Sequence, residues 1–189
     1  MGKRGAAEPE RLTPDSPSPG DSGAVIVSTF NDLRDELVST LCYLLGNRDD
    51  ALDVAQETFL KCWRAKSSAA GIENLRAWIF RIGLNAAKDF QRSAWNRRMK
   101  TTVTEESMIA APESPLGRTL EERETLTRLR EAITELRQDE KEVFLLRQNG
   151  DLTYEQIAEI RHTPVGTVKT QMRAALIKLR KILVTAEPT

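Results

Sequence analysis

The chain has 189 residues, 40% of them apolar and 30% charged, and its 28 basic residues balance its 28 acidic ones. This composition suits one mid-sized or two small globular domains and excludes a largely disordered chain. No apolar run approaches the roughly 20 residues of a membrane-spanning helix, and no cationic segment followed by an apolar one opens the sequence, so we expect a cytoplasmic protein without a membrane span.

Residues 1–24 are predicted to form a flexible tail. They contain four prolines among Ser, Gly and Asp residues, with too little apolar surface to offset the entropy of ordering. From Thr29 the pattern turns helical, because leucines recur at spacings of three and four as far as Leu45. Gly46 and Asn47 then suit the end of this helix.

A second helix is predicted from about Asp49 or Asp50, whose carboxylates favour a helix N-terminus. Its apolar side holds Leu52, Ala55, Phe59 and Cys62 together with Trp63. Its polar side holds Asp53, Gln56, Glu57 and Lys61.

A third helix is predicted from about Asn74 to Asn96, with an apolar side that includes Trp78. Between Gln91 and Lys100 there are four basic residues and no acidic one. Residues 101–118 lack helical periodicity and contain two prolines and a glycine, which indicates a linker between domains. The first helical module therefore spans residues 25–100. The side of the third helix opposite its apolar residues carries Arg76, Arg81, Asn85, Lys88, Asp89 and Arg92.

The second module spans residues 119–186 and is also predicted to be helical. Apolar residues at spacings of three and four predict a helix that begins near Thr119, and a short helix follows over 139–148. Between Glu121 and Glu142 eight acidic residues stand against five basic ones, and we interpret this stretch as a solvated helix face. The fold class is therefore all-α, with two small helical domains joined by a flexible linker.

Residues 154–175 have the spacing of a helix-turn-helix. A small residue, Ala158, stands where the two helices cross, His162 to Pro164 form the turn, and Val168 faces the core. The closing helix carries five Lys or Arg and no acid from Val165 to Leu183. Its apolar arc is predicted to hold Val168, Met172, Ala175, Leu176, Leu179, Ile182 and Leu183.

An acid-free cationic side on such a helix predicts binding to duplex DNA. In this motif the first turns of the second helix enter the major groove, where Arg173 suits guanine and Gln171 suits adenine. Arg180 and Lys181 lie farther along and are expected to meet phosphates. The predicted groove residues are Thr167, Lys169, Thr170, Gln171 and Arg173.

The sequence contains no pattern typical of a metal or disulfide site. Cys42 and Cys62 stand in apolar-periodic stretches and form no CxxC or Cys/His cluster, so we interpret them as reduced core cysteines. The single histidine, His162, has no Cys or carboxylate neighbour at ligand spacing, which favours a structural role.

Two stretches, DDALDVAQETFLKCWRA and NLRAWIFRIGLNAAKDFQRS, resemble region 2 of the sigma-70 family, and LTYEQIAEIRHTPVGTVKTQMRAALIKLRKIL resembles region 4. With a short linker in place of region 3, the chain is similar to the extracytoplasmic-function (ECF) sigma factors of bacterial RNA polymerase. The resemblance implies a promoter-recognition subunit that performs no bond chemistry. It implies as partners core RNA polymerase, through the clamp helices of its largest subunit and the flap of its second largest, together with promoter DNA and an anti-sigma factor.

The resemblance also implies residue roles. Asp53, Gln56 and Glu57 fall where the family docks on the clamp helices, and Asn85, Asp89 and Arg92 fall in the segment that handles the melted minus-10 element. Holding a single strand needs cations for its backbone and planar groups for its bases. Core packing stays open as the alternative for Phe80 and Trp95, and it is the expected role of Trp78. The residues that offer the required types are Phe80, Arg81, Arg92, Trp95, Arg97 and Arg98.

Some positions depart from the family pattern. His162 takes a turn position where the family usually has glycine, so a positive φ is predicted there for a residue type that tolerates it. Gln171, Ala174, Leu84 and Ser93 stand where arginine is frequent. The usual promoter preference therefore does not transfer unchanged.

Two other classes of protein fit the sequence less well. A conventional helix-turn-helix regulator would bind a palindromic duplex alone, but it has no reason to place an aromatic and basic helix end within residues 74–100. An enzyme is disfavoured because no GxxxxGK, HExxH, GxSxG or metal-ligand cluster occurs, and no cofactor is expected.

Overall fold

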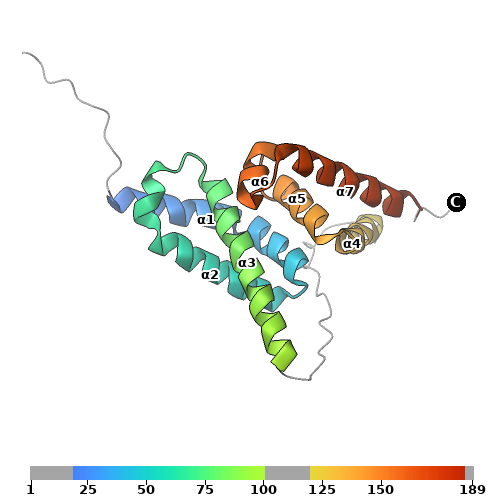
Figure 1. Cartoon of the computed structure of the whole chain (residues 1–189), viewed down its shortest axis with the longest axis horizontal. Helices are drawn as coiled ribbons and strands as arrows, with labels where there is room; N and C mark the ends of the chain where they lie inside the picture. Colours follow the sequence, from blue (N-terminus) through green and yellow to red (C-terminus); the bar gives the residue numbers. More distant parts are fainter. Residues whose placement is uncertain (1–18, 101–119, 186–189) are drawn as a thin grey trace, which may run out of the picture.

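The computed structural model describes residues 19–100 and 120–185, and every regular element in that part of the chain is helical. Figure 1 shows two helical bodies side by side, one built from the N-terminal and one from the C-terminal half. The predicted linker, 101–118, lies outside the described residues, as does the tail up to residue 18. The first body contains α1 (Pro19–Leu45), α2 (Arg48–Arg64), the short 3-10 helix η1 (Lys66–Gly71) and α3 (Leu75–Lys100). The second contains α4 (Leu120–Thr134), α5 (Gln138–Gln148), α6 (Tyr154–Arg161) and α7 (Val165–Thr185).

Helix α1 begins earlier than the sequence predicted. It starts at Pro19 rather than near Thr29, so residues 19–24 belong to a helix and not to the tail. Proline suits the first position of a helix, where its missing N–H has no partner to lose. Ile26 and Phe30 continue the buried face toward Leu33, and this burial offsets the entropy of the added turns.

Local caps set the junction between α1 and α2. Gly46, just beyond α1, has a φ of 76°, a left-handed conformation that glycine adopts without strain. Asn47 caps α2, since its Oδ1 accepts hydrogen bonds from the backbone N–H groups of Asp49 (2.8 Å) and Asp50 (3.1 Å). Helix α3 is capped in the same way by Asn74, whose Oδ1 accepts from the N–H of Ala77 at 2.9 Å.

Helices α1, α2 and α3 enclose the core of the first module. Helix α3 approaches α1 closely at Gly83, where an added Cβ would lie 2.9 Å from a Leu37 methyl group. Thr58 is fully buried and donates its hydroxyl to the Val54 carbonyl at 2.7 Å, so it costs the core no unpaired polar group. Both cysteines are buried and free as predicted, and burial raises the pKa of the Cys62 thiol to about 11.

The second module contains the predicted helix-turn-helix. Thr153 caps α6 through a hydrogen bond from the N–H of Gln156 (3.2 Å), and the Gln156 side chain accepts from the Thr153 N–H (2.9 Å). Ala158 is buried where α6 meets α7. His162 ends α6 with φ 51° and ψ 45°, which confirms the positive φ predicted for this position. Asp151 has a φ of 50°, which the sequence did not predict.

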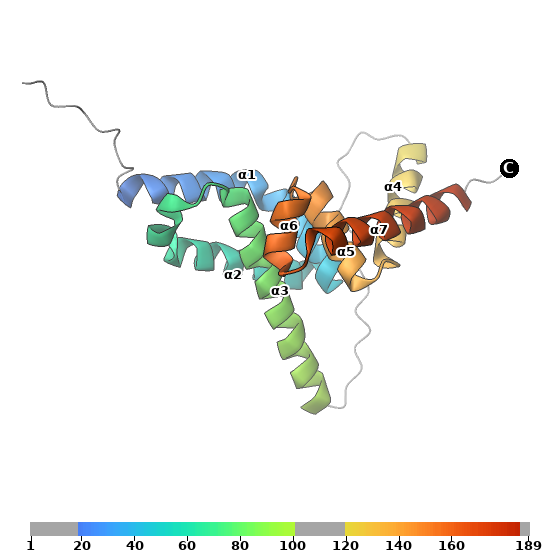
Figure 2. The same cartoon turned by 45° about the horizontal axis from the view of Figure 1, so that its top comes forward.

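The two modules touch each other. Helices α1 and α3 of the first pack against α5 and α6 of the second, as Figures 1 and 2 both show. Asn149 Nδ2 donates to Thr40 Oγ1 at 3.1 Å, and Arg76 Nη1 donates to the Gly150 carbonyl at 3.3 Å. Such bonds contribute about 0.5–1.5 kcal/mol each, so each one alone holds the modules together only weakly.

None of the helices in the described ranges is both long enough and apolar enough to cross a bilayer.

Candidate nucleic-acid interface

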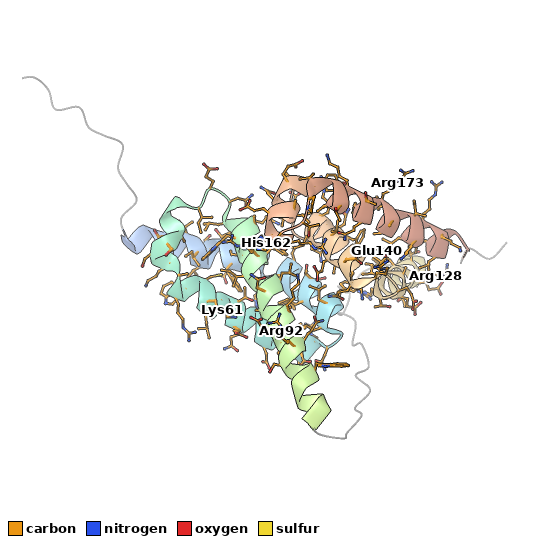
Figure 3. All side chains as sticks on the ribbon, viewed as in Figure 1. Lys61, Arg92, Arg128, Glu140, His162 and Arg173 are labelled. Carbon is orange, nitrogen blue, oxygen red and sulfur yellow. The ribbon has the colours of Figure 1, made fainter. Side chains whose placement is uncertain are left out.

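One side of α7 is anchored in the module and the other faces outward. Val168, Met172, Ala175 and Leu179 are buried along the inner side. Figure 3 shows Arg173 on the outer side of α7. Because the anchoring residues recur at spacings of three and four, the residues between them must face away from the core. The exposed predicted groove residues are Thr167, Lys169, Thr170 and Arg173, and Arg180 and Lys181 are exposed farther along.

Gln171 differs from the other predicted groove residues. It is half-buried, its Oε1 accepts a hydrogen bond from Arg161 Nη1, and its Nε2 donates to Asp139 Oδ2 at 3.1 Å. Both ends of the amide are therefore engaged within the protein. The predicted two-bond contact with adenine is not supported by this arrangement, because it would need both ends turned toward the groove.

The apolar arc of α7 is narrower than predicted. Leu176 was expected on the buried side, but it is 47% exposed, and the neighbouring Ile177 is 59% exposed. The remaining members of the arc are at least partly buried. The reason is that α7 packs only along the narrow line where α4, α5 and α6 reach it. A shallow depression of about 280 Å³ on this outer side is lined by Tyr154, Lys169, Met172, Arg173, Leu176, Ile177 and Arg180.

In the first module, α3 presents a second polar face. Asn85, Asp89 and Arg92 are all exposed, at helical spacings that place them on one side. Arg92 pairs with Asp89 at 3.4 Å, and Figure 3 places Arg92 well apart from Arg173. Arg81 is half-buried and lines a depression of about 390 Å³ between α3 and α6.

The structure separates the aromatic candidates on α3. Trp95 is 64% exposed, which leaves its ring accessible for stacking. Phe80 is only 1% exposed, so the prediction that it offers a surface to a displaced base is wrong. It lies in the core because α3 turns this side toward α1 and α2, as it does the buried Trp78. The side chains of Arg97 and Arg98 lie outside the described part of the structure.

Helix α2 carries the three residues predicted to dock on polymerase. Asp53, Gln56 and Glu57 are exposed, opposite a buried side that includes Val54 and Cys62. Glu57 forms an ion pair with Lys61 of its own helix at 2.9 Å. These three side chains thus share an accessible polar surface.

Two apolar side chains extend the outward side of α2, and their exposure was not predicted from the sequence. Leu60 is exposed three residues after Glu57, and this helical spacing predicts that both lie on the same side of α2. Trp63 was placed on the apolar side but is partly exposed; it stacks on Phe59, and Lys66 Nζ lies 4.2 Å from its ring centroid.

The acidic stretch before the helix-turn-helix is not wholly solvated. Glu140 and Glu142 are both buried, which corrects the interpretation of the whole stretch as an exposed face. Lys178 Nζ of α7 lies 2.7 Å from Glu140 Oε2. Glu142 is paired with Arg161 and Lys88. Buried carboxylates need such partners, and these partners come from other helices, which the local sequence does not reveal.

Within the described residues, no group of three or more His, Cys, Asp or Glu side chains is arranged to hold a metal ion. The exposed features instead define an all-helical protein with two polar faces, one of them on a helix-turn-helix.

Comparisons with known proteins agree with this class. The family model described as Sigma-70 region 2 matches residues 29–97, and the one described as Sigma-70, region 4 matches residues 126–179. RNA polymerase sigma factor SigV of Bacillus subtilis (strain 168) is 31% identical over 164 residues, covering 87% of this chain and 93% of SigV. The ECF RNA polymerase sigma-E factor of Haemophilus influenzae is 32% identical over 137 residues, covering 67% of this chain and 70% of that factor.

Among solved structures, the chain is similar in fold to the sigma factor RpoE from Bartonella quintana, co-crystallised with the anti-sigma factor NepR. The TM-score is 0.72 at 22% identity, with 87% of this chain and 97% of RpoE covered.

The chain therefore belongs to the sigma-70 family, as an ECF sigma factor. It acts with core RNA polymerase on promoter DNA to initiate transcription, and it is not an enzyme.

Proposed function

We propose that the two modules divide promoter recognition between them. The module of residues 25–100 docks on the clamp helices of the polymerase largest subunit and holds the melted minus-10 strand. The module of residues 119–186 reads the minus-35 element as duplex and meets the flap of the second largest subunit. One observation carries this proposal. The helices α3 and α7 lie in separate modules, and each has an exposed face whose residue types suit binding to nucleic acid.

The face of α7 suits duplex DNA. It presents Lys169 and Arg173 with no acidic residue between Val165 and Leu183, so nothing on this segment repels phosphates. Arg173 is exposed and long enough for a bidentate pair with guanine, whereas Arg180 and Lys181 lie farther along for backbone contacts.

The face of α3 suits a single strand. Arg92 and the half-buried Arg81 supply positive charge, and the exposed ring of Trp95 supplies a stacking surface. Asn85 and Asp89 add polar groups for base edges. Arg97 and Arg98 continue the basic end of this helix in the sequence.

Docking on polymerase is assigned to the exposed side of α2. Asp53 and Glu57 supply negative charge and Gln56 a neutral amide, and the partly exposed Leu60 adds apolar contact. A surface of this mixed kind suits a reversible interface. We also assign the chain to the cytoplasm and expect an anti-sigma factor to regulate it.

Run-off transcription with purified core polymerase tests the proposal. On a promoter library, core enzyme with the chain should give discrete transcripts that core enzyme alone does not give. The opposite result has two parts: the pure chain does not associate with core polymerase, and the chain alone binds intact duplex tightly. That result would instead identify a conventional helix-turn-helix regulator.

A further inference from the structure

An ion pair joins the strand-binding helix of the first module to the second module. Lys88 Nζ of α3 lies 3.3 Å from Glu142 Oε2 of α5. The same oxygen accepts a hydrogen bond from Arg161 Nε of α6 at 3.0 Å. The side chain of Glu142 is only 5% exposed, whereas that of Lys88 is 40% exposed.

Lys88 occupies a central place on the outward side of α3. It follows Asn85 by three positions and precedes Arg92 by four, which places it on the same flank of the helix. Asn85 and Arg92 are exposed, but Lys88 is turned to a carboxylate of the other module. A carboxylate oxygen is the same kind of acceptor for an ammonium group as a phosphate oxygen.

Glu142 does not need Lys88 for its own burial. Arg161, from the same module, already provides a hydrogen-bonded countercharge and is itself mostly buried. If the modules separate, Glu142 keeps Arg161 and no carboxylate is left buried without a partner. The contact with Lys88 is thus the part of this cluster that can break without disrupting either module.

The rest of the junction is also separable. Among the described residues, its hydrogen bonds run from Asn149 to Thr40, from Arg76 to the Gly150 carbonyl and between Arg130 and Tyr43, and each is a single contact. Between α3 and α6 the modules leave a depression of about 390 Å³ instead of a filled core. A permanent junction between domains would be filled to the density of a protein interior.

We propose that Glu142 is an intramolecular latch that occupies Lys88 while the modules are closed, and that Lys88 binds a backbone phosphate of the promoter strand once they open. The inference rests on the proposed role of α3 in holding the melted strand. It assigns a further DNA-binding residue, Lys88, and gives the contact between modules a self-inhibiting function. Opening and strand binding are then linked, because the Glu142 carboxylate and a backbone phosphate compete for the Lys88 ammonium group.

The latch is tested on the free full-length chain by energy transfer between dyes attached at Ser67→Cys and Glu155→Cys, which are exposed sites in different modules. Lys88→Gln and Glu142→Gln should each lower the transfer efficiency. Asn149→Ala should lower it as well, and it leaves the buried Glu142–Arg161 pair intact. Lys61→Gln is the matched control, since Lys61 has a similar exposure but pairs within its own helix, and it should leave the efficiency unchanged. Unchanged efficiency in Lys88→Gln and Asn149→Ala would overturn the latch.

The strand contact is tested on the assembled holoenzyme with a fluorescent single-stranded oligonucleotide of a promoter found by run-off transcription. Lys88→Gln should weaken binding and lower the slope of log affinity against log salt by about 0.7, the amount expected for one phosphate contact on a single strand. Glu142→Gln should bind as the wild type does, because the modules are already apart. Wild-type affinity and slope in Lys88→Gln would overturn the strand contact. Failure of the chain to bind core polymerase would count against the proposed function, while the energy transfer would still decide the latch.

Discussion

The side chain of Gln171 in α7 donates a hydrogen bond to Asp139 of α5 at 3.1 Å. Arg161 of α6 donates a second hydrogen bond to the same amide, so three helices meet at this side chain. The bonds fix how α7 lies relative to the rest of the helix-turn-helix. They also leave Arg173 as the exposed residue with the greatest capacity to read a base.

Arg173→Ala is expected to weaken recognition of the upstream promoter element. A bidentate arginine contact discriminates by about 1–3 kcal/mol, so duplex affinity should fall roughly fivefold to 150-fold. Promoter-directed transcription and binding to core polymerase are measured side by side, and only transcription should fall. Arg34→Ala, an exposed arginine on α1, is the control, and equal promoter activity in both variants would remove Arg173 from the DNA-binding face.

Glu57→Ala is expected to weaken binding to core polymerase without changing the stability of the fold. Glu57 is exposed and its ion pair is confined to α2, so the change removes a docking charge but no core contact. An exposed charged contact contributes about 0.2–1 kcal/mol, which corresponds to a loss of affinity of up to about fivefold. A titration with labelled core enzyme measures it. Asp35→Ala on α1 should behave as the wild type, and identical affinities in both variants would argue against the α2 face.

Gly150→Ala and Gly166→Ala are expected to differ although the chemical change is the same. An added Cβ at Gly150 would lie 2.5 Å from the Leu146 carbonyl oxygen, whereas nothing lies within 4 Å of one at Gly166 in α7. We expect Gly150→Ala to lower the free energy of unfolding by about 1–3 kcal/mol and Gly166→Ala to be neutral or stabilising. Denaturant unfolding measures the free energy of unfolding of both variants. Equal free energies would show that the backbone around Gly150 shifts to accommodate the added Cβ without loss of stability.

His162→Gly is expected to stabilise the protein. The left-handed conformation costs a non-glycine residue about 1–2 kcal/mol, and glycine offsets part of that gain by its greater freedom when unfolded. The net gain should be about 0.5–1 kcal/mol. His162→Val, with a branched side chain, should destabilise the turn instead. Thermal unfolding measures the stability of both variants. A lower stability for His162→Gly than for His162→Val would contradict this explanation.

Cys62 is expected to resist alkylation in the folded protein. Burial raises its thiol pKa to about 11 from 9.0, and the reactive thiolate is therefore scarce below that pH. Because the folded pKa is the higher one, the contribution of this thiol to stability is fully present below pH 9 and is lost as the pH rises from about 9 to about 11. Mass spectrometry after iodoacetamide treatment at pH 8 should find Cys62 unmodified in buffer and modified in denaturant. Rapid modification without denaturant would show that the core opens locally.

Much of the helical layout was predictable because its signals are local. The cap at Thr153, the turn at His162 and the outward cations of α7 depend on residues within a few positions of one another. Such signals do not depend on how the rest of the chain packs. The separation of Asp53 and Glu57 from the buried side of α2 is local in the same way.

The predictions of burial and exposure that the structure contradicts share a different cause. Phe80 and Trp95 are both aromatic residues of α3, yet one is buried and the other exposed, because only one meets α1 and α2. Leu176 continues the apolar pattern of α7 but lies where no neighbouring helix reaches it. In each case, burial was decided by a partner helix distant in the sequence.

From the sequence by itself came the helices, the helix-turn-helix and an acid-free cationic side on α7, because periodicity and capping act over a few residues. Only the tertiary structure decided which polar groups are available to a partner. Glu142 is buried beside Arg161 and within reach of Lys88, and Gln171 is engaged by Asp139. These pairings depend on how separate helices pack, since a buried charge is stable only where folding brings an opposite charge to it.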